Sequence, residues 1–129
     1  MNILFFLTPK QDVATLEIRY TVRQATEKLR RCGYTAVPVL DEGGRYCGSL
    51  TEGDLLYAFA GKVEDWEKLP IRGLLRESRF PAVHIDAEIG DLLQSALAQN
   101  YVPVVDDRGC LIGIVTRRKI IQYLISNRP

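Results

Sequence analysis

Two short segments of this sequence carry residues suited to binding an anion that also bears hydroxyl groups. Thr51 and Asp54 bracket the expected start of a helix, where free N–H groups favour negative charge and where a hydroxyl and a carboxylate could meet a ribose. Arg117, Arg118 and Lys119 form a cationic cluster at another expected helix start. Guanidinium groups bind phosphate oxygens in pairs and stay charged. The plain alternatives are a helix N-cap with a favourable first-turn acid, and a solvated basic turn.

The other reactive side chains do not indicate catalysis. Cys32, Cys47 and Cys110 are odd in number and far apart, so reduced and buried thiols are expected. Because there is no C-x-x-C pair and only His84 could supply a nitrogen ligand, neither a disulfide framework nor a zinc site is expected. His84 lies in a strand-like alternation and is interpreted as structural. With no P-loop and no dinucleotide fingerprint, we expect no enzyme, no cofactor and no metal.

Composition favours an ordinary globular protein with a small-molecule or protein partner. The chain has 129 residues, of which 47% are apolar and 26% are charged, enough for one real core. Seventeen basic residues against sixteen acidic ones leave a net charge of +1, with the signs interspersed. This pattern argues against nucleic acid or an anionic membrane as partner. The apolar stretch 3–7 is too short to span a bilayer and has no cleavage pattern, so a cytoplasmic location is expected.

The strongest signal is an internal repeat. "VPVLDEGGRYCGSLT" (37–51) aligns without a gap with "VPVVDDRGCLIGIVT" (102–116), and seven of the fifteen positions match. Each copy is an apolar run, a turn and a second apolar run, which predicts two strands joined by a tight turn. Gly44 and Gly109 suit the positive φ of that turn. The shared proline, Pro38 in the first copy, predicts a strand start or an exposed edge.

Helical patterns flank each hairpin. The segment 21–24 resembles a capping box, and Gly33 is well placed to end the helix that follows. In the second copy, Asp86 is predicted to cap the corresponding helix. Apolar residues in 55–59 and 120–125 predict a further helix after each hairpin. Each unit therefore reads strand, helix, strand, strand, helix.

These elements predict an α/β (α+β) protein built from two βαββα units. Residues 1–62 form the first repeat with an N-terminal segment, 63–79 a connector with a short helix near 71–75, and 80–129 the second repeat. A unit of this size buries little surface alone. We therefore expect the copies to pack through their sheets around a pseudo-twofold axis, which leaves a cleft between them.

The two motifs together resemble a known family. "AVPVLDEGGRYCGSLTEGD" and "YVPVVDDRGCLIGIVTRRK" are similar to the CBS repeat, which occurs in tandem as the Bateman module, and the resemblance extends from about Pro9 to the C-terminus. It implies a regulatory, ligand-sensing module. Related modules bind AMP, ATP, S-adenosylmethionine, cyclic di-AMP or nothing, and they usually regulate an attached or partner protein.

The resemblance also implies where a ligand would lie. In the family, the Asp of this motif, here Asp54, binds ribose hydroxyls, and the backbone before the strand proline contacts adenine. Tyr34 could stack on the base. For the residues of the strands, core packing remains the alternative. The expected ligand-binding residues are Val13, Ala14, Tyr34, Thr35, Ala36, Val37, Pro38, Thr51, Asp54, Thr116, Arg117 and Arg118.

The second copy departs from the family pattern because Lys119 stands where the first copy has Asp54. We therefore expect one principal adenine-nucleotide site, built by both copies and lying between the two repeats, rather than two equivalent ones. "GYTAVPVLD" and "TRRKII" resemble stand-alone CBS proteins that bind cyclic di-AMP, with Arg117 and Arg118 on the phosphates. Asp54 is equally compatible with AMP, ADP or ATP. A homodimer and an unknown effector protein are the expected partners, and a CBS protein that has no functional nucleotide site is the alternative.

Overall fold

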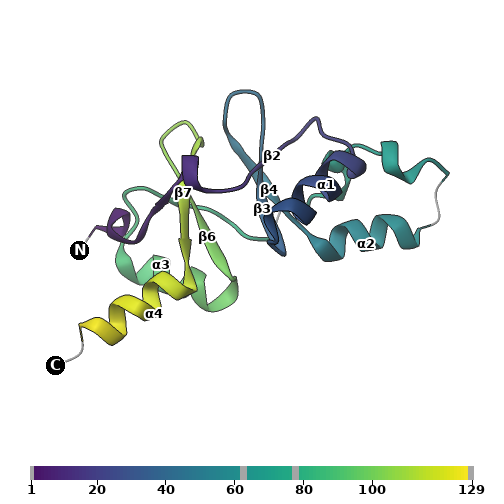
Figure 1. The fold of residues 1–129 in the computed structure, drawn as a ribbon. Helices are drawn as coiled ribbons and strands as arrows, with labels where there is room; N and C mark the ends of the chain where they lie inside the picture. Colours follow the sequence, from purple (N-terminus) through teal and green to yellow (C-terminus); the bar gives the residue numbers. More distant parts are fainter. Residues whose placement is uncertain (1, 62–63, 77–78, 128–129) are drawn as a thin grey trace. The chain divides into compact units, whose positions relative to one another are not determined.

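The computed structural model describes residues 2–61, 64–76 and 79–127. The chain divides into two compact units, each with its own core. One unit is Ala14–Arg79, and the other joins Met1–Val13 to Phe80–Pro129 (Figure 1). Each unit is described by itself below.

The unit Ala14–Arg79 contains the first repeat and has a three-stranded sheet in the order β2-β3-β4. β2 runs parallel to β3, and β3 and β4 form the antiparallel hairpin. Its elements are β2 (Leu16–Glu17), α1 (Val22–Cys32), β3 (Ala36–Leu40), β4 (Tyr46–Thr51), α2 (Glu52–Ala60) and the 3₁₀ turns η3 (Trp66–Lys68) and η4 (Ile71–Leu74).

The start and end of α1 follow from local chemistry. The Thr21 hydroxyl accepts a hydrogen bond from the Gln24 N–H, and the Gln24 side chain accepts one from the Thr21 N–H, which confirms the capping box. The helix ends at Gly33, whose φ of +72° is the left-handed conformation expected there. Between these ends, Val22, Ala25 and Leu29 face the core.

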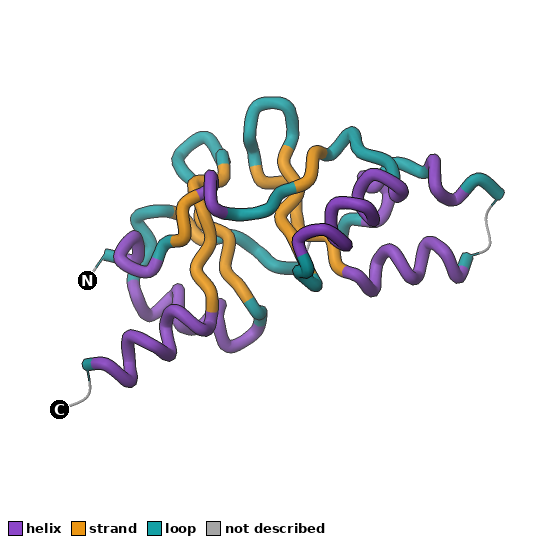
Figure 2. The backbone as a smooth tube through the Cα atoms, in the orientation of Figure 1, coloured by secondary structure: helices purple, strands orange, loops and turns teal. Residues whose placement is uncertain are grey.

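The other unit contains the second repeat and a four-stranded sheet in the order β1-β7-β6-β5. Figure 2 colours the strands orange and the helices purple. β5 is parallel to β6, and β6 and β7 form the hairpin. Its elements are η1 (Ile3–Phe6), β1 (Thr8–Pro9), η2 (Lys10–Asp12), β5 (Val83–His84), α3 (Ile89–Ala98), β6 (Tyr101–Val105), β7 (Leu111–Thr116) and α4 (Arg117–Ser126).

The N-terminal segment differs from the sequence expectation, which placed it with the first repeat. β1 pairs antiparallel with β7, with Thr8 opposite Ile114, and the side chains of Ile3 and Phe6 are buried in the core of the second repeat. The Phe6 ring also meets Tyr123 of α4 edge to face. This placement pairs the edge of β7 and buries apolar surface that the second repeat would otherwise expose.

The order β, α, β, β, α is confirmed in both units, and the short helix expected in the connector is the 3₁₀ turn η4. The predicted cap at Asp86 is wrong. α3 begins after Glu88, and Asp86 lies in a turn where its N–H donates to the His84 Nδ1 atom and the Ala87 N–H donates to the His84 carbonyl. This turn delays the helix by two residues. Among the described helices, none combines the length and apolar character needed to cross a membrane.

Gly113 of β7 provides a test of the placement of β1. A Cβ atom at this position would lie 2.2 Å from the Thr8 carbonyl oxygen. We expect Gly113→Ala to displace β1 and to lower the free energy of unfolding by about 1–3 kcal/mol, measured by urea denaturation.

Gly90→Ala is the matched control, because a Cβ atom there meets nothing within 4 Å at the start of α3. This change should leave stability equal or raise it by up to about 1 kcal/mol. Equal stability of the two variants would contradict the observed pairing of β1.

Candidate functional site

The hairpin register brings the candidate ligand residues of the first repeat to one place. Ala36, the first residue of β3, pairs with Thr51, the last residue of β4. The Glu52 N–H at the start of α2 donates to the Thr35 carbonyl oxygen, with an N···O distance of 2.9 Å. The loop that precedes β3 and the start of α2 are therefore neighbours within this unit.

Thr51 and Asp54 form a reciprocal cap at the start of α2. The Thr51 hydroxyl accepts from the Asp54 N–H at 3.1 Å, and the Asp54 Oδ2 atom accepts from the Thr51 N–H at 2.9 Å. The N-cap and first-turn roles considered from the sequence are thus both present. They orient the carboxylate across the first turn of α2.

Asp54 has a charged partner that sequence analysis did not find. Its side chain is only 4% exposed and forms an ion pair with the Arg79 guanidinium through Nη2. Burial alone would raise the pKa of Asp54, but the hydrogen bonds from Arg79 and from Thr51 hold that pKa below its ordinary value. The carboxylate is therefore ionised at neutral pH.

Arg79 ends the described part of the connector and lies 25 residues from Asp54 along the chain. Its Nε atom is buried and has no hydrogen-bond partner among the described residues. A lone arginine at the end of a charged connector has no spacing or motif that would mark it. Only the three-dimensional structure brings it to the candidate site.

The structure separates the remaining first-repeat candidates into two groups. Tyr34 is 55% exposed and Thr35 is exposed, so both are accessible to a ligand. Val37 and Pro38 are buried, as the core-packing alternative requires, and Ala36 is half-buried.

Val13 and Ala14 are half-buried and lie between η2 and β2, outside any strand. Ala14 packs against the core of the first repeat. The expectation that they belong to the first short strand is therefore corrected, since β2 begins at Leu16.

The second repeat has the same register with different side chains. Tyr101 pairs with Thr116, and the Thr116 hydroxyl accepts from the Lys119 N–H at 3.2 Å. Lys119 has no carboxylate that could accept a hydrogen bond from the Thr116 N–H, so the second repeat lacks the reciprocal cap of the first.

The two arginines at the start of α4 have different environments. The Arg117 side chain hydrogen-bonds to the C-terminal end of α3. Its Nε donates to the Ala96 carbonyl at 2.7 Å, and its terminal nitrogens donate to the Leu97 carbonyl and the Asn100 side chain, each at 3.0 Å. This arginine acts as a C-terminal cap of a neighbouring helix. Both arginines are exposed, but Arg118 does not make these hydrogen bonds to the end of α3.

The position that matches Tyr34 in the second repeat is filled by the buried Gln99. Its side-chain nitrogen donates to the carbonyls of Pro81 and Tyr101, at 3.1 and 3.0 Å. The Tyr101 ring meets Phe80 edge to face. The first repeat exposes an aromatic ring and a loop at this place, whereas the second repeat has packed and hydrogen-bonded side chains there.

Comparison with known proteins identifies the family. The CBS domain family matches residues 6–61 and 73–126, so the chain belongs to the CBS domain family and carries two copies of the domain.

Individual relatives differ in how much of their own length the match covers. Homoserine O-acetyltransferase of Methanohalophilus mahii is 32% identical over 106 residues, which are 82% of this chain but only 21% of that protein. The chain thus spans about a fifth of that relative. Cyclic di-AMP receptor B of Bacillus subtilis is 24% identical over 123 residues, which are 92% of this chain and 83% of the receptor.

The fold is shared with solved CBS structures. CbpB of Listeria monocytogenes, crystallised with cyclic di-AMP, superposes with a TM-score of 0.85 at 24% identity and covers 93% of this chain and 92% of its own. CBSX2 in complex with AMP gives a TM-score of 0.81 at 24% identity, with 97% and 96% covered. At this identity the likeness establishes the fold.

The pair between Asp54 and Arg79 can be tested through stability. We expect Arg79→Gln to lower the free energy of unfolding by about 1.5–3 kcal/mol at pH 7, because a buried carboxylate loses a charged hydrogen bond. Since the folded-state pKa of Asp54 is lowered, its contribution is present above the unfolded-state pKa and is lost as pH falls through the folded-state value. The difference between the proteins should shrink in acid, as urea denaturation at several pH values would measure.

Arg19→Gln is the matched control, because Arg19 pairs with Glu17 at the surface, where such pairs contribute about 0–1 kcal/mol. Similar effects of the two substitutions at pH 7, or a loss at Arg79 that does not depend on pH, would contradict the assignment.

Proposed function

We propose that this chain is a regulatory CBS pair that binds an adenine nucleotide, with the principal site in the first repeat, and that occupancy is signalled to a partner protein. The observation that carries the proposal is the exposed Tyr34–Thr35 loop beside the start of α2. An aromatic ring, an exposed loop and a helix N-terminus then lie close together. These groups suit a base, its polar edge and an anion, respectively.

Asp54 would have two successive partners in this proposal. In the structure, the Arg79 guanidinium pairs with this carboxylate. A ribose hydroxyl that bonds to Asp54 must compete with this guanidinium, and an arginine displaced from the pair would then be available to phosphate oxygens. Arg79 thereby joins the set of candidate ligand residues, to which the sequence motif did not assign it.

The second repeat contributes a weaker case for anion binding. Arg117 is committed to the carbonyls at the end of α3, so exposed Arg118 is the better candidate for a phosphate contact. At the position that matches Tyr34, the second repeat has the buried Gln99, and the neighbouring Tyr101 ring packs against Phe80. The second repeat therefore offers a base less exposed aromatic surface there. This asymmetry supports one principal site.

Cyclic di-AMP and AMP are the first ligands to test, because solved relatives carry them. The alternative is a CBS protein that acts through protein contacts alone. It is favoured by one observation, the nearly complete burial of Asp54 against Arg79. The two functions differ in whether any adenine nucleotide binds.

The test is a calorimetric and thermal-shift screen of AMP, ADP, ATP, cyclic di-AMP and S-adenosylmethionine. A ligand present at a hundred times its Kd should add about 2.7 kcal/mol of stability. If Tyr34 stacks on the base, Tyr34→Ala should weaken binding by about 1–3 kcal/mol, whereas Tyr34→Phe, which keeps the ring, should bind nearly as well as the parent chain.

For the phosphate contact, Arg118→Ala is compared with Arg31→Ala, an exposed arginine at the end of α1. Only the Arg118 variant should lose affinity. Absence of binding by all five nucleotides would overturn the nucleotide function and favour the alternative, and unchanged binding by Tyr34→Ala would overturn the assigned site.

We also propose that the chain forms a homodimer through exposed apolar helix faces. α3 and α4 leave an apolar groove lined by Leu93, Ala96, Leu97, Arg117, Ile120, Ile121 and Leu124. Leu97 is 75% exposed, and Ile121 and Leu124 are more than half exposed. α2 likewise exposes Leu56 and Tyr57. Apolar groups gathered on helix faces favour burial against a second copy.

Light scattering after size-exclusion chromatography should give the mass of two chains. Leu97→Asp, at the most exposed of these groove residues, should shift the mass toward one chain, because a charge cannot be buried in an apolar interface at low cost. Leu4→Asp is a control at an exposed leucine of η1, outside the groove. A monomeric parent chain, or an equal response to both changes, would contradict the dimer.

A further inference from the structure

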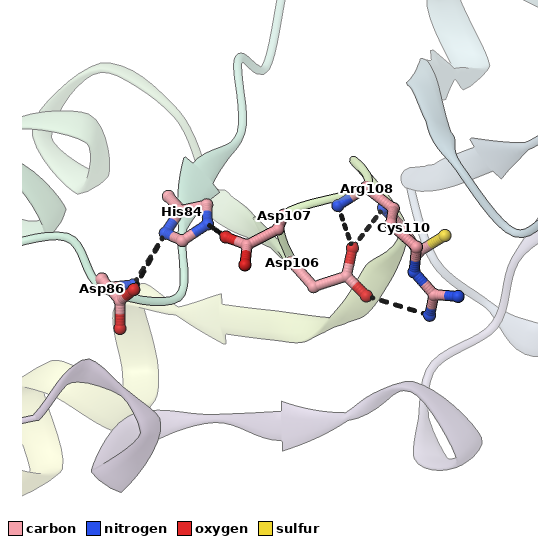
Figure 3. Close-up of polar contacts among 6 residues, drawn as sticks. All are labelled: His84, Asp86, Asp106, Asp107, Arg108 and Cys110. Atoms are coloured by element: carbon pink, nitrogen blue, oxygen red, sulfur yellow. Dashed lines mark hydrogen bonds and ion pairs between the residues drawn. The ribbon is translucent and has the colours of Figure 1, made fainter.

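His84, Asp86 and Asp107 form a side-chain cluster in the second repeat, away from the helix starts discussed above. His84 is the last residue of β5 and pairs in parallel with Val105, the last residue of β6. Asp86 lies two residues after the end of β5, and Asp107 lies two residues after the end of β6. Because the two strands are parallel and in register, both carboxylates lie near the histidine. Figure 3 shows the imidazole between the two aspartates.

Both ring nitrogens face these groups. The His84 Nε2 atom lies 2.5 Å from the Asp107 Oδ1 atom, and Nδ1 lies 3.7 Å from the Asp86 Oδ2 atom. One potential ligand atom from each of the three residues lies within 4.8 Å of the others. The side chains of Asp86 and Asp107 are 85% and 89% exposed, so an ion could enter from solvent and the carboxylates could adjust to it.

The turn that carries Asp107 is held in place by its neighbour Asp106. The Asp106 Oδ1 atom accepts the N–H groups of Arg108 and Cys110, at 2.9 and 3.0 Å. The Arg108 guanidinium lies 3.4 Å from the Asp106 Oδ2 atom (Figure 3). Among the described residues, no lysine or arginine forms an ion pair with Asp86 or Asp107. Two carboxylates thus share one imidazole.

The first repeat provides an internal comparison. By strand register, Glu17 occupies the place of His84, and two residues later Arg19 occupies the place of Asp86. There the Arg19 guanidinium pairs with Glu17 at 3.0 Å. The first repeat thus neutralises its acid with a side chain of its own, whereas the second repeat offers one nitrogen and two oxygen donors.

We propose that this cluster binds a divalent transition-metal ion such as Zn²⁺, with His84 Nε2 and the Asp107 carboxylate as ligands. Imidazole nitrogen favours these ions over Mg²⁺ and Ca²⁺, which take oxygen ligands. The ring binds the ion as the tautomer that has its proton on Nδ1, so that the Nε2 lone pair faces the metal, and the two donor atoms separate to about 3.3 Å, the spacing of a tetrahedral site. In this tautomer Nδ1 no longer accepts from the Asp86 N–H, as it does in the structure, and instead donates to the Asp86 carboxylate, which orients the imidazole.

The test is a Zn²⁺ titration followed by calorimetry and by NMR of the imidazole. Because His84 is the only histidine of the chain, its ring signals report this site alone and distinguish it from the cysteines. We expect one Zn²⁺ per chain to perturb the ring signals. His84→Ala and Asp107→Asn should each weaken binding at this site at least 10-fold. Asp86→Asn should weaken it by about 10-fold, because it removes only the orienting group.

Glu42→Gln is the matched control, since Glu42 occupies in the first repeat the turn position of Asp107. It should leave the affinity unchanged, and Mg²⁺ should not perturb the ring. Unperturbed imidazole signals at saturating Zn²⁺, or binding that is indifferent to Asp107→Asn, would overturn the proposal. Thermal unfolding of each variant without metal confirms that the exposed substitutions leave the fold intact.

Discussion

Each hairpin pairs the first residue of its leading strand with the last residue of its returning strand, Ala36 with Thr51 and Tyr101 with Thr116. A helix begins immediately after the returning strand in both repeats. The loop before the hairpin and the helix N-terminus are therefore adjacent wherever this register holds. In β7, buried and half-buried residues alternate, so a slip of one residue would exchange its two faces. Burial of the core therefore favours the observed register and with it the start of α4.

The two repeats share the same order of elements but differ in the polar contacts at the start of the second helix. In the first repeat, a buried carboxylate closes the helix cap and draws in Arg79. In the second, Lys119 stands in place of that acid, and the Arg117 guanidinium donates to the carbonyls at the end of α3. The first repeat therefore has a charged pair and an exposed aromatic ring, while in the second the Arg117 and Gln99 side chains hydrogen-bond to backbone carbonyls. The internal symmetry of the fold does not extend to its chemistry.

Local patterns made much of the fold predictable. The gapless repeat, the capping box at Thr21 and the helix end at Gly33 depend on neighbours in the chain, and the structure confirms the elements that they predict. The pairing of β1 with β7, the contact of Arg79 with Asp54 and the cluster at His84 were not predictable in this way. Each joins residues more than 20 positions apart, and no spacing rule marks it. An expectation of no metal site, built on cysteine motifs, could not detect carboxylates that meet the histidine across parallel strands.

The central claim is that the first repeat, and not the second, presents the principal nucleotide site. Backbone amide NMR during titration with cyclic di-AMP and with AMP tests it most directly, because each repeat has its own amide signals. The account predicts that at least one of these nucleotides shifts the amides of residues 34–36 and 51–54 most strongly. Stronger shifts at residues 99–101 and 116–119, or no shifts with either nucleotide, would contradict it.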